Sequence, residues 1–332
     1  MSSAAEVVPM PRPETAGTPR SVYLDAYLAP FRPWLERETV TEILVNKPGE
    51  LWIEDAALPR MQRVELPEID DLLLQRLAEQ VARTTHQGIN REHPLLAATL
   101  PGGERIQLCG PPATRAHWAM AIRRHRLLDL PLSAYDHGPL QPPPPRPAPD
   151  RQADPIGFLK HAVARRQTIL ISGGTSTGKT TFLGAMLREI PANERVILVE
   201  DTAELRLPGA NGVGLIAVHG ELGEARVATD TLVQAALRLR PDRIVLGELR
   251  GREAIGFLRA INTGHPGSFS TIHANSPRGA LDQLALMAMQ AGIGLNRAET
   301  VDYAASVIDL VVQLERSGGQ RRIAAISDAR SL

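Results

Sequence analysis

The chain has 332 residues, 43% of them hydrophobic, which predicts two domains with modest cores. Its 37 basic residues balance 37 acidic ones, so no strong global field attracts it to nucleic acid, although a local basic patch is not excluded. The single cysteine, Cys109, excludes an intrachain disulfide and fits a reducing compartment. We expect it to be a small buried residue beside the strand-like run 106–108.

Residues 1–20 lack the apolar segment of a signal peptide and are rich in Pro, Ser, Ala and Thr, which predicts a disordered tail. No apolar run approaches the roughly 18 residues that a membrane span needs. These features predict a cytoplasmic protein whose membrane contact, if any, is peripheral.

Residues 21–136 are expected to form an α+β domain. Apolar runs at 43–45 and 51–53 flank the turn sequence Asn-Lys-Pro-Gly and predict a hairpin. A helical pattern begins at Pro67, and its apolar side chains share one face: Ile69, Leu72, Leu73, Leu77 and Val81. The runs 105–108 and 118–122 are further predicted strands.

Residues 137–154 are expected to link two domains. Seven of the eleven residues in 139–149 are proline, which excludes a helix or a central strand and favours an extended polyproline spacer. A ligand for an SH3-type domain is the alternative, but the position between two folded parts favours a linker.

Residues 155–332 alternate strand and helix patterns, as doubly wound α/β domains do. Short apolar strands are predicted at 168–172, 196–199 and 244–246, and a helix at 181–190. In such folds ligands bind at the carboxyl ends of the parallel strands.

A glycine-rich loop between the first of these strands and the helix fits the pattern G-x-x-x-x-G-K-[ST]. In such a loop, backbone N–H groups converge on phosphate oxygens and the next helix adds its positive end. Lys179 would reach the β- and γ-phosphates of ATP, and the Thr180 hydroxyl would bind Mg²⁺. The predicted cradle comprises Gly173, Gly174, Thr175, Ser176, Thr177, Gly178, Lys179, Thr180 and Thr181. The alternative, a mere glycine turn, does not account for the strand and helix around it.

Two acids follow the other predicted strands, Glu200 after 196–199 and Glu248 after 243–247. We expect Glu248 to hold the magnesium shell or polarise the attacking water, and Glu200 to be the second acid, in the role of a general base. Solvated carboxylates at strand ends are the alternative.

The segment 263–275 carries His265 and His273. Their spacing fits no usual zinc pair, and no cysteine lies nearby in sequence. Both are candidate sensors of the γ-phosphate, with a purely structural role as the alternative.

The sequence Ser-Gly-Gly-Gln-Arg at 317–321 is similar to the signature loop of ABC transporters, but it follows the Glu248 strand instead of preceding it. It separates the apolar runs 310–314 and 322–326, so a hairpin turn is the better interpretation.

Together these motifs resemble the secretion ATPase superfamily, most closely the VirB11 type of type IV secretion systems. Four motifs occur in that family's order: the phosphate loop, an Asp box at 199–205, a Walker B segment at 247–251 and a histidine box at 263–275. The likeness continues in the first domain through 40–43, 46–50 and 100–107.

The resemblance implies a homo-hexameric ATPase with a RecA-like C-terminal domain, ATP and Mg²⁺ as cofactors, and nucleotide between the two domains. It also implies partners among other secretion-system ATPases and inner-membrane channel components, with the ring at the cytoplasmic face of the inner membrane. By analogy, Arg105, Arg123 and Arg240 would close over the γ-phosphate, a role that suits the planar guanidinium.

One departure is that Gly247 stands where a simple Walker B motif carries aspartate. The eight-residue histidine spacing disfavours a retraction motor, whereas a tight-adherence pilus, type IV pilus or type II secretion ATPase remains the alternative machine. A nucleotide-gated scaffold and a DNA-translocating motor are alternative functions for such a chain. Neutral charge and 4% aromatic residues weigh against the last.

Overall fold

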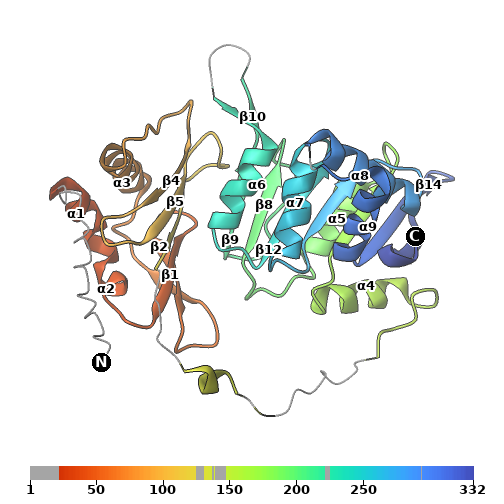
Figure 1. Ribbon diagram of the computed structural model, residues 1–332, viewed down its shortest axis with the longest axis horizontal. Helices are drawn as coiled ribbons and strands as arrows, with labels where there is room; N and C mark the ends of the chain where they lie inside the picture. Colours follow the sequence, from red (N-terminus) through yellow and green to blue (C-terminus); the bar gives the residue numbers. More distant parts are fainter. Residues whose placement is uncertain (1–21, 125–130, 137, 139–146, 221–224, 293) are drawn as a thin grey trace, which may run out of the picture.

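The computed structural model describes residues 22–124, 131–136, 138, 147–220, 225–292 and 294–332. The chain folds around two β-sheets that lie side by side, the first near the N-terminus and the second carrying the C-terminus (Figure 1). The expected tail and residues 139–146 of the proline run lie outside the described residues, and the domain boundaries stay a prediction.

The first sheet has six antiparallel strands in the order β3-β2-β1-β6-β5-β4. Its strands are β1 (Val40–Val45), β2 (Glu50–Asp55), β3 (Gln62–Glu65), β4 (Leu95–Thr99), β5 (Arg105–Cys109) and β6 (Ala119–Arg123). The helical elements that precede or cross it are α1 (Val22–Leu28), η1 (Ala29–Phe31), α2 (Arg32–Leu35) and α3 (Asp71–Thr84). The predicted hairpin and the two further strands are therefore confirmed.

The helix expected from Pro67 begins instead at Asp71, because the Asp70 carboxylate caps it by accepting the N–H of Leu73 at 2.7 Å. Its buried side chains include Leu74, Leu77 and Val81. Leu72 was also predicted to lie on this buried face, but its side chain is 52% exposed, so the prediction for Leu72 was wrong.

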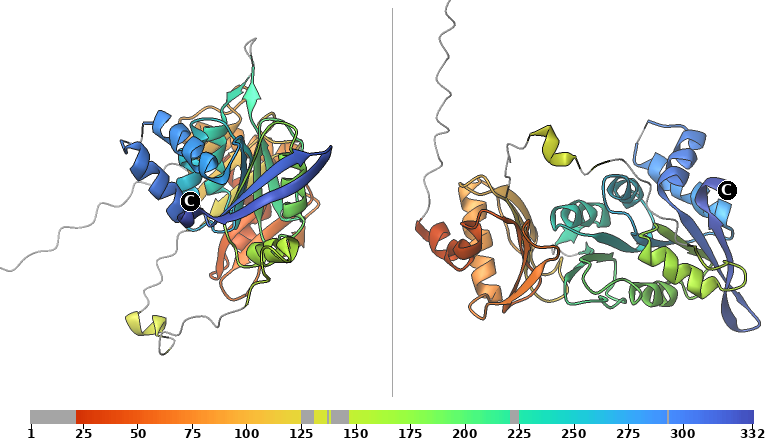
Figure 2. Two further views of the ribbon diagram at one scale, coloured as in Figure 1. Left: turned by 90° about the vertical axis from the view of Figure 1, so that its right-hand side faces the viewer. Right: turned by 90° about the horizontal axis from the view of Figure 1, so that it is seen from below.

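The second sheet has seven strands in the order β15-β14-β7-β13-β12-β8-β9, parallel except for the pairing of β14 with β15. The strands are β7 (Ile169–Gly173), β8 (Val196–Glu200), β9 (Gly212–Ile216), β12 (Arg243–Leu249), β13 (Phe269–Ile272), β14 (Leu310–Ser317) and β15 (Gln320–Asp328). The C-terminal hairpin predicted around 317–321 is thus confirmed (Figure 2).

Two hydrophobic clusters cover the two faces of this sheet. Helices α4 (Pro155–Ala164) and α5 (Lys179–Leu187) contribute to one cluster, which also contains Ile169 and Ile171 of β7. The other cluster contains Leu170 and side chains of α6 (Thr229–Arg238), α7 (Glu253–Asn262), α8 (Pro277–Gln290) and α9 (Arg297–Val307). Alternating residues of one strand face opposite helix layers, as a doubly wound sheet requires.

The remaining short elements are η2 (Leu132–Tyr135), β10 (Val218–His219), β11 (Arg226–Val227) and η3 (Ala329–Ser331). Among the residues that the structure describes, no helix combines the length and the hydrophobicity that crossing a membrane requires.

The two sheets share a core. Leu44, Cys109 and Ala121 of the first sheet belong to the same cluster as α6 and α7 of the second. Cys109 is fully buried, as expected, and burial raises the pKa of its thiol to about 12. The first sheet is therefore packed between its own helices and the second sheet.

Candidate active site

The glycine loop joins β7 to α5 as the sequence predicts, although α5 begins at Lys179 and not at 181. Gly178 has φ +89°, a conformation that favours glycine. A Cβ on Gly173 would lie 2.9 Å from the carbonyl oxygen of Leu314, so β14 also requires a glycine there. Backbone N–H groups of residues 175–178 donate to no other described residue, which leaves them available to an anion.

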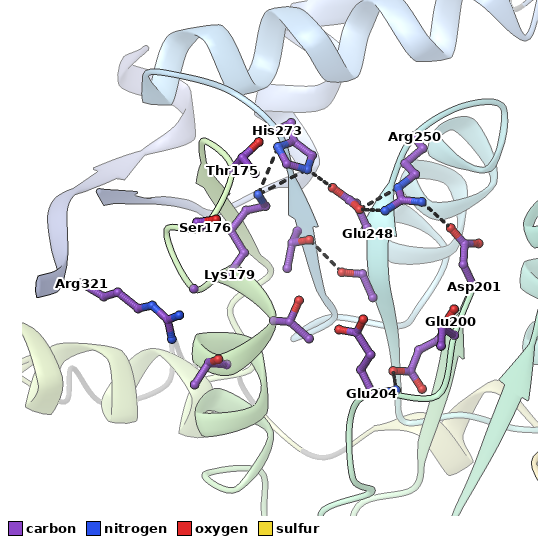
Figure 3. A pocket seen from close by; sticks show the side chains of 16 residues that line it. Thr175, Ser176, Lys179, Glu200, Asp201, Glu204, Glu248, Arg250, His273 and Arg321 are labelled. Atoms are coloured by element: carbon purple, nitrogen blue, oxygen red, sulfur yellow. Dashed lines mark hydrogen bonds and ion pairs between the residues drawn. The ribbon is translucent and has the colours of Figure 1, made fainter. Parts of the chain in front are cut away.

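A cavity of about 330 Å³ opens beside this loop at the carboxyl ends of the parallel strands (Figure 3). It is lined by Thr175, Ser176, Gly178, Lys179, Thr180, Thr181, Glu200, Asp201, Thr202, Glu204, Gly247, Glu248, Arg250, Thr271, His273 and Arg321. The loop, the Asp box, the Walker B segment and the histidine box therefore meet at one place.

Lys179 lies within this cavity and is held by the loop itself. Its Nζ donates to the carbonyl oxygens of Gly173 at 3.0 Å and Gly174 at 3.2 Å, and lies 3.2 Å from Nδ1 of His273. Burial lowers the pKa of Lys179, and the nearby Glu248 carboxylate partly opposes this. A partly desolvated cation beside free N–H groups is suited to an anionic ligand.

Glu248 stands across the cavity from the loop. Its Oε2 accepts a hydrogen bond from Nε of Arg250 at 2.6 Å, and the same guanidinium reaches Oδ2 of Asp201 at 3.1 Å. Oε1 lies 2.7 Å from Nε2 of His273, but without the alignment of a hydrogen bond, so this buried oxygen has no donor among the described residues. Such an oxygen fits a magnesium-bound water or the metal itself.

Comparisons with known proteins agree with this geometry. The family model described as Type II/IV secretion system protein matches residues 151–323. The type IV secretion system protein PtlH of Bordetella pertussis is 39% identical over 326 residues, which cover 92% of this chain and 94% of PtlH. VirB11 of Bartonella henselae is 33% identical, over 90% of this chain and 91% of its own. The chain belongs to the VirB11 family of type IV secretion proteins.

The fold agrees as well. The crystal structure of the VirB11 ATPase from the Brucella suis type IV secretion system, in complex with sulphate, matches with a TM-score of 0.82 and 32% identity. The match covers 93% of this chain and 95% of that one. The predicted family and the RecA-like α/β fold with an N-terminal domain are confirmed.

Glu200, expected to act as a second acid, ends β8 at the cavity wall but is engaged on both oxygens. Oε1 accepts the N–H groups of Glu204 at 3.0 Å and Leu205 at 2.9 Å, and Oε2 pairs with Arg115. This buried carboxylate accepts from three donors and is held on both oxygens, so these contacts favour a positioning role.

The two histidines of the VirB11 histidine box lie at opposite ends of β13. His273 follows the strand and lines the cavity, whereas His265 precedes it, and its Nδ1–H donates to the carbonyl oxygen of Ala260, 2.9 Å away. His265 does not line the cavity, because the four residues of β13 separate it from the carboxyl end of the strand, and its predicted contact with the nucleotide stays a prediction.

The three arginines assigned by analogy to VirB11 ATPases do not line this cavity either. Arg105 and Arg123 face each other on β5 and β6, beside a separate pocket next to Arg238 of α6. Arg240 pairs with Glu54 and Asp242 between the two sheets. None of the three therefore lines the cavity of its own subunit, and their predicted contact with the γ-phosphate stays a prediction.

The charged cavity residues Glu204, Arg250 and Arg321 were given no individual role by the sequence. Arg250 stands two positions after Glu248, a spacing that could have signalled a contact around the strand end. Arg321 comes from the C-terminal hairpin, and a Cβ added to Gly178 would lie 2.7 Å from its Cδ. The pairing of β15 with β14, and of β14 with β7, brings that side chain to the loop.

Proposed function

We propose that this chain hydrolyses ATP with Mg²⁺ and is the motor subunit of a type IV secretion system. The observation that carries the proposal is the cavity in which a phosphate loop, a partly desolvated lysine and a carboxylate oxygen without a hydrogen-bond donor face one another. Such an arrangement suits phosphoryl transfer, whose catalysis is mostly positioning and charge neutralisation.

Each group has a distinct task. The N–H groups of 175–178 bind phosphate oxygens, and Lys179 neutralises the charge that develops on the β- and γ-phosphates. The Thr180 hydroxyl and the Glu248 carboxylate would hold Mg²⁺, which would supply positive charge to neutralise the phosphates. His273 lies between Lys179 and Glu248 and contacts both, so a movement of either side chain on ligand binding would also move His273.

Membership of the VirB11 family supports the proposed assembly of this chain and its place in a secretion system. By analogy, six copies form a ring at the cytoplasmic face of the inner membrane, and nucleotide-driven domain movement acts on other secretion ATPases and channel components. A neighbouring copy would also be the source of Arg105 and Arg123 for the γ-phosphate. The PtlH and VirB11 relatives belong to type IV secretion, which favours that machine over a pilus or type II secretion system.

Replacing Lys179 by alanine tests the proposal. We expect the rate of phosphate release to fall at least about 100-fold, because one cation of the charge-stabilising set is lost. Lys160→Ala is the matched control, since among the described residues Lys160 pairs only with Glu189, at the surface, and such a pair contributes little to stability. Both variants should keep the unfolding temperature of the parent. Equal rates in Lys179→Ala and the parent would overturn the proposal.

A further inference from the structure

The loop between β5 and β6 reaches across to the second sheet. Thr114 forms an antiparallel bridge with Leu215 of β9, and the N–H of Ile216 donates to the carbonyl of Ala113 at 2.8 Å. Because β9 is the edge strand, this loop of the first domain extends the edge of the nucleotide-site sheet. The two domains are therefore joined by backbone as well as by side chains.

Arg115, the next residue in this loop, extends its side chain to the end of β8 in the second sheet. Its guanidinium pairs with Glu200, whose side chain is 3% exposed at the end of β8. The other oxygen of Glu200 holds the N–H groups of Glu204 and Leu205. One buried carboxylate thus connects an arginine of the first domain to the segment 201–205.

Glycines on both neighbouring strands accommodate this connection. A Cβ on Gly214 of β9 would lie 2.5 Å from Nε of Arg115, and a Cβ on Gly247 of β12 would lie 3.3 Å from Cγ of Glu200. Neither glycine has a positive φ, so backbone conformation does not require them. Space for the Arg115–Glu200 pair is a physical reason for a glycine at each position, including the unusual Gly247 of the Walker B segment.

The segment 201–205 forms one wall of the cavity. Asp201 pairs with Arg250, which in turn binds Glu248, and Glu204 lines the cavity directly. Figure 3 shows Glu200, Asp201 and Glu204 together on the side of the cavity opposite the loop. Moving this segment would therefore move the acidic groups relative to Lys179.

We propose that Arg115 is a positioning residue: through Glu200 it makes the acidic wall of the nucleotide site depend on docking of the first domain. When the loop 110–118 leaves β9, Glu200 loses its cation and releases the amides of Glu204 and Leu205. A buried carboxylate without its partner is costly, so the segment rearranges. The inference rests on the proposed ATPase function only for its effect on turnover.

Hydrogen exchange tests the connection without any catalysis. In Arg115→Gln, exchange at the amides of Glu204 and Leu205 should become at least about tenfold faster, since their acceptor is no longer held. Asn46→Ala is the matched control: Asn46 also joins the domains, through Arg195 and Asn211, but does not touch the cavity. It should leave exchange at 204 and 205 unchanged.

Turnover gives the second readout. Arg115→Gln should lower kcat roughly tenfold or more through misplaced acids, whereas the KM for ATP changes little because the phosphate loop is intact. Arg115→Lys, which keeps the charge, should recover part of the loss. In a Glu200→Gln background, Arg115→Gln should add little, because the two residues act in series.

Unchanged exchange at 204 and 205 in Arg115→Gln would overturn the inference, as would an effect on kcat that adds fully to that of Glu200→Gln. A decrease in kcat equal to that in Asn46→Ala would also overturn the inference. It would indicate that any weakening of the contact between the domains lowers turnover. If the parent protein showed no hydrolysis, the proposed function would fail while the exchange measurement still decided the role of Arg115.

Discussion

At the scale of single residues, the nucleotide site is built from side chains whose partners are other site residues. Lys179, His273, Glu248 and Arg250 form a continuous series of contacts across the cavity. The Glu248 hydrogen bond raises the pKa of Arg250, so this guanidinium stays charged. A ligand entering between Lys179 and Glu248 must break or replace these contacts, which couples binding to a rearrangement of the series.

Arg321 extends the site beyond the motifs. Because it lies against Gly178 and lines the cavity, we expect Arg321→Gln to weaken ATP binding about 3- to 10-fold through loss of one partly solvated charge. Arg316 faces it across the hairpin but does not line the cavity, so Arg316→Gln is the control. Titration of a fluorescent ATP analogue measures both. Equal affinities in the two variants would contradict this role.

Cys109 predicts a pH dependence of stability. Its pKa is about 12 in the folded protein against 9.0 for a free thiol, so between these values the folded state keeps a proton that the unfolded state loses. The contribution of Cys109 to the free energy of unfolding is therefore fully present below pH 9 and decreases as the pH rises towards 12. From pH 8 to pH 10, the unfolding free energy of the parent should fall about 1 kcal/mol more than that of Cys109→Ala. Urea titrations at both pH values check this, and parallel decreases would contradict it.

At the scale of elements, α5 and its preceding loop show why similar residues differ in role. Gly178 has a positive φ and contacts Arg321, whereas Gly184 lies inside α5 and a Cβ there would meet only Leu205 at an ordinary 3.5 Å. The first glycine serves the turn, and the second only lowers helix propensity.

Alanine substitutions should therefore act in opposite directions. Gly178→Ala should destabilise by about 1–2 kcal/mol from its left-handed backbone and weaken ATP binding. Gly184→Ala should stabilise by about 0.5–1 kcal/mol and leave binding intact. Thermal unfolding with and without Mg-ATP distinguishes the two, and a stabilising shift in both would show that the turn does not need glycine.

At the scale of the whole molecule, polar contacts as well as the shared core hold the two sheets together. Arg195 is fully buried and donates from Nη1 to Asn46 of the first domain at 2.6 Å and to Asn211 at 2.5 Å. Burial lowers its pKa to about 9, which still leaves it charged at neutral pH. Such polar contacts allow the domains to dock in one orientation and to separate at a lower cost than a purely apolar core.

The proposed ring gives the prediction at this scale. With Mg²⁺ and a non-hydrolysable ATP analogue, we expect sedimentation to detect a particle of six chains, as the analogy with VirB11 ATPases implies. Arginines on β5 and β6, which do not line the subunit's own cavity, would then be available to a neighbouring chain. Arg105→Ala should reduce hydrolysis without preventing nucleotide binding. A monomer at all concentrations with undiminished turnover would exclude the ring as the active form.

Local sequence patterns determined much of this molecule. Short β-branched runs between polar turns specify the strands that precede Gly173, Glu200 and Glu248, and parallel strands place their carboxyl ends at one edge. The phosphate loop, its two acids and His273 could therefore be assigned to one site from the amino-acid sequence alone. These features depend on neighbours in the chain and on one rule of topology.

Only the tertiary structure decided the remaining roles. Contacts between distant segments placed Arg321 over the loop, tied Glu200 to Arg115, and moved Arg105 and Arg240 away from the cavity. An arginine or a glutamate has the same chemistry at each of these positions, and its role follows from which group shares its buried surroundings. Strand order and domain docking decide these surroundings, because they determine which charged groups are buried next to one another.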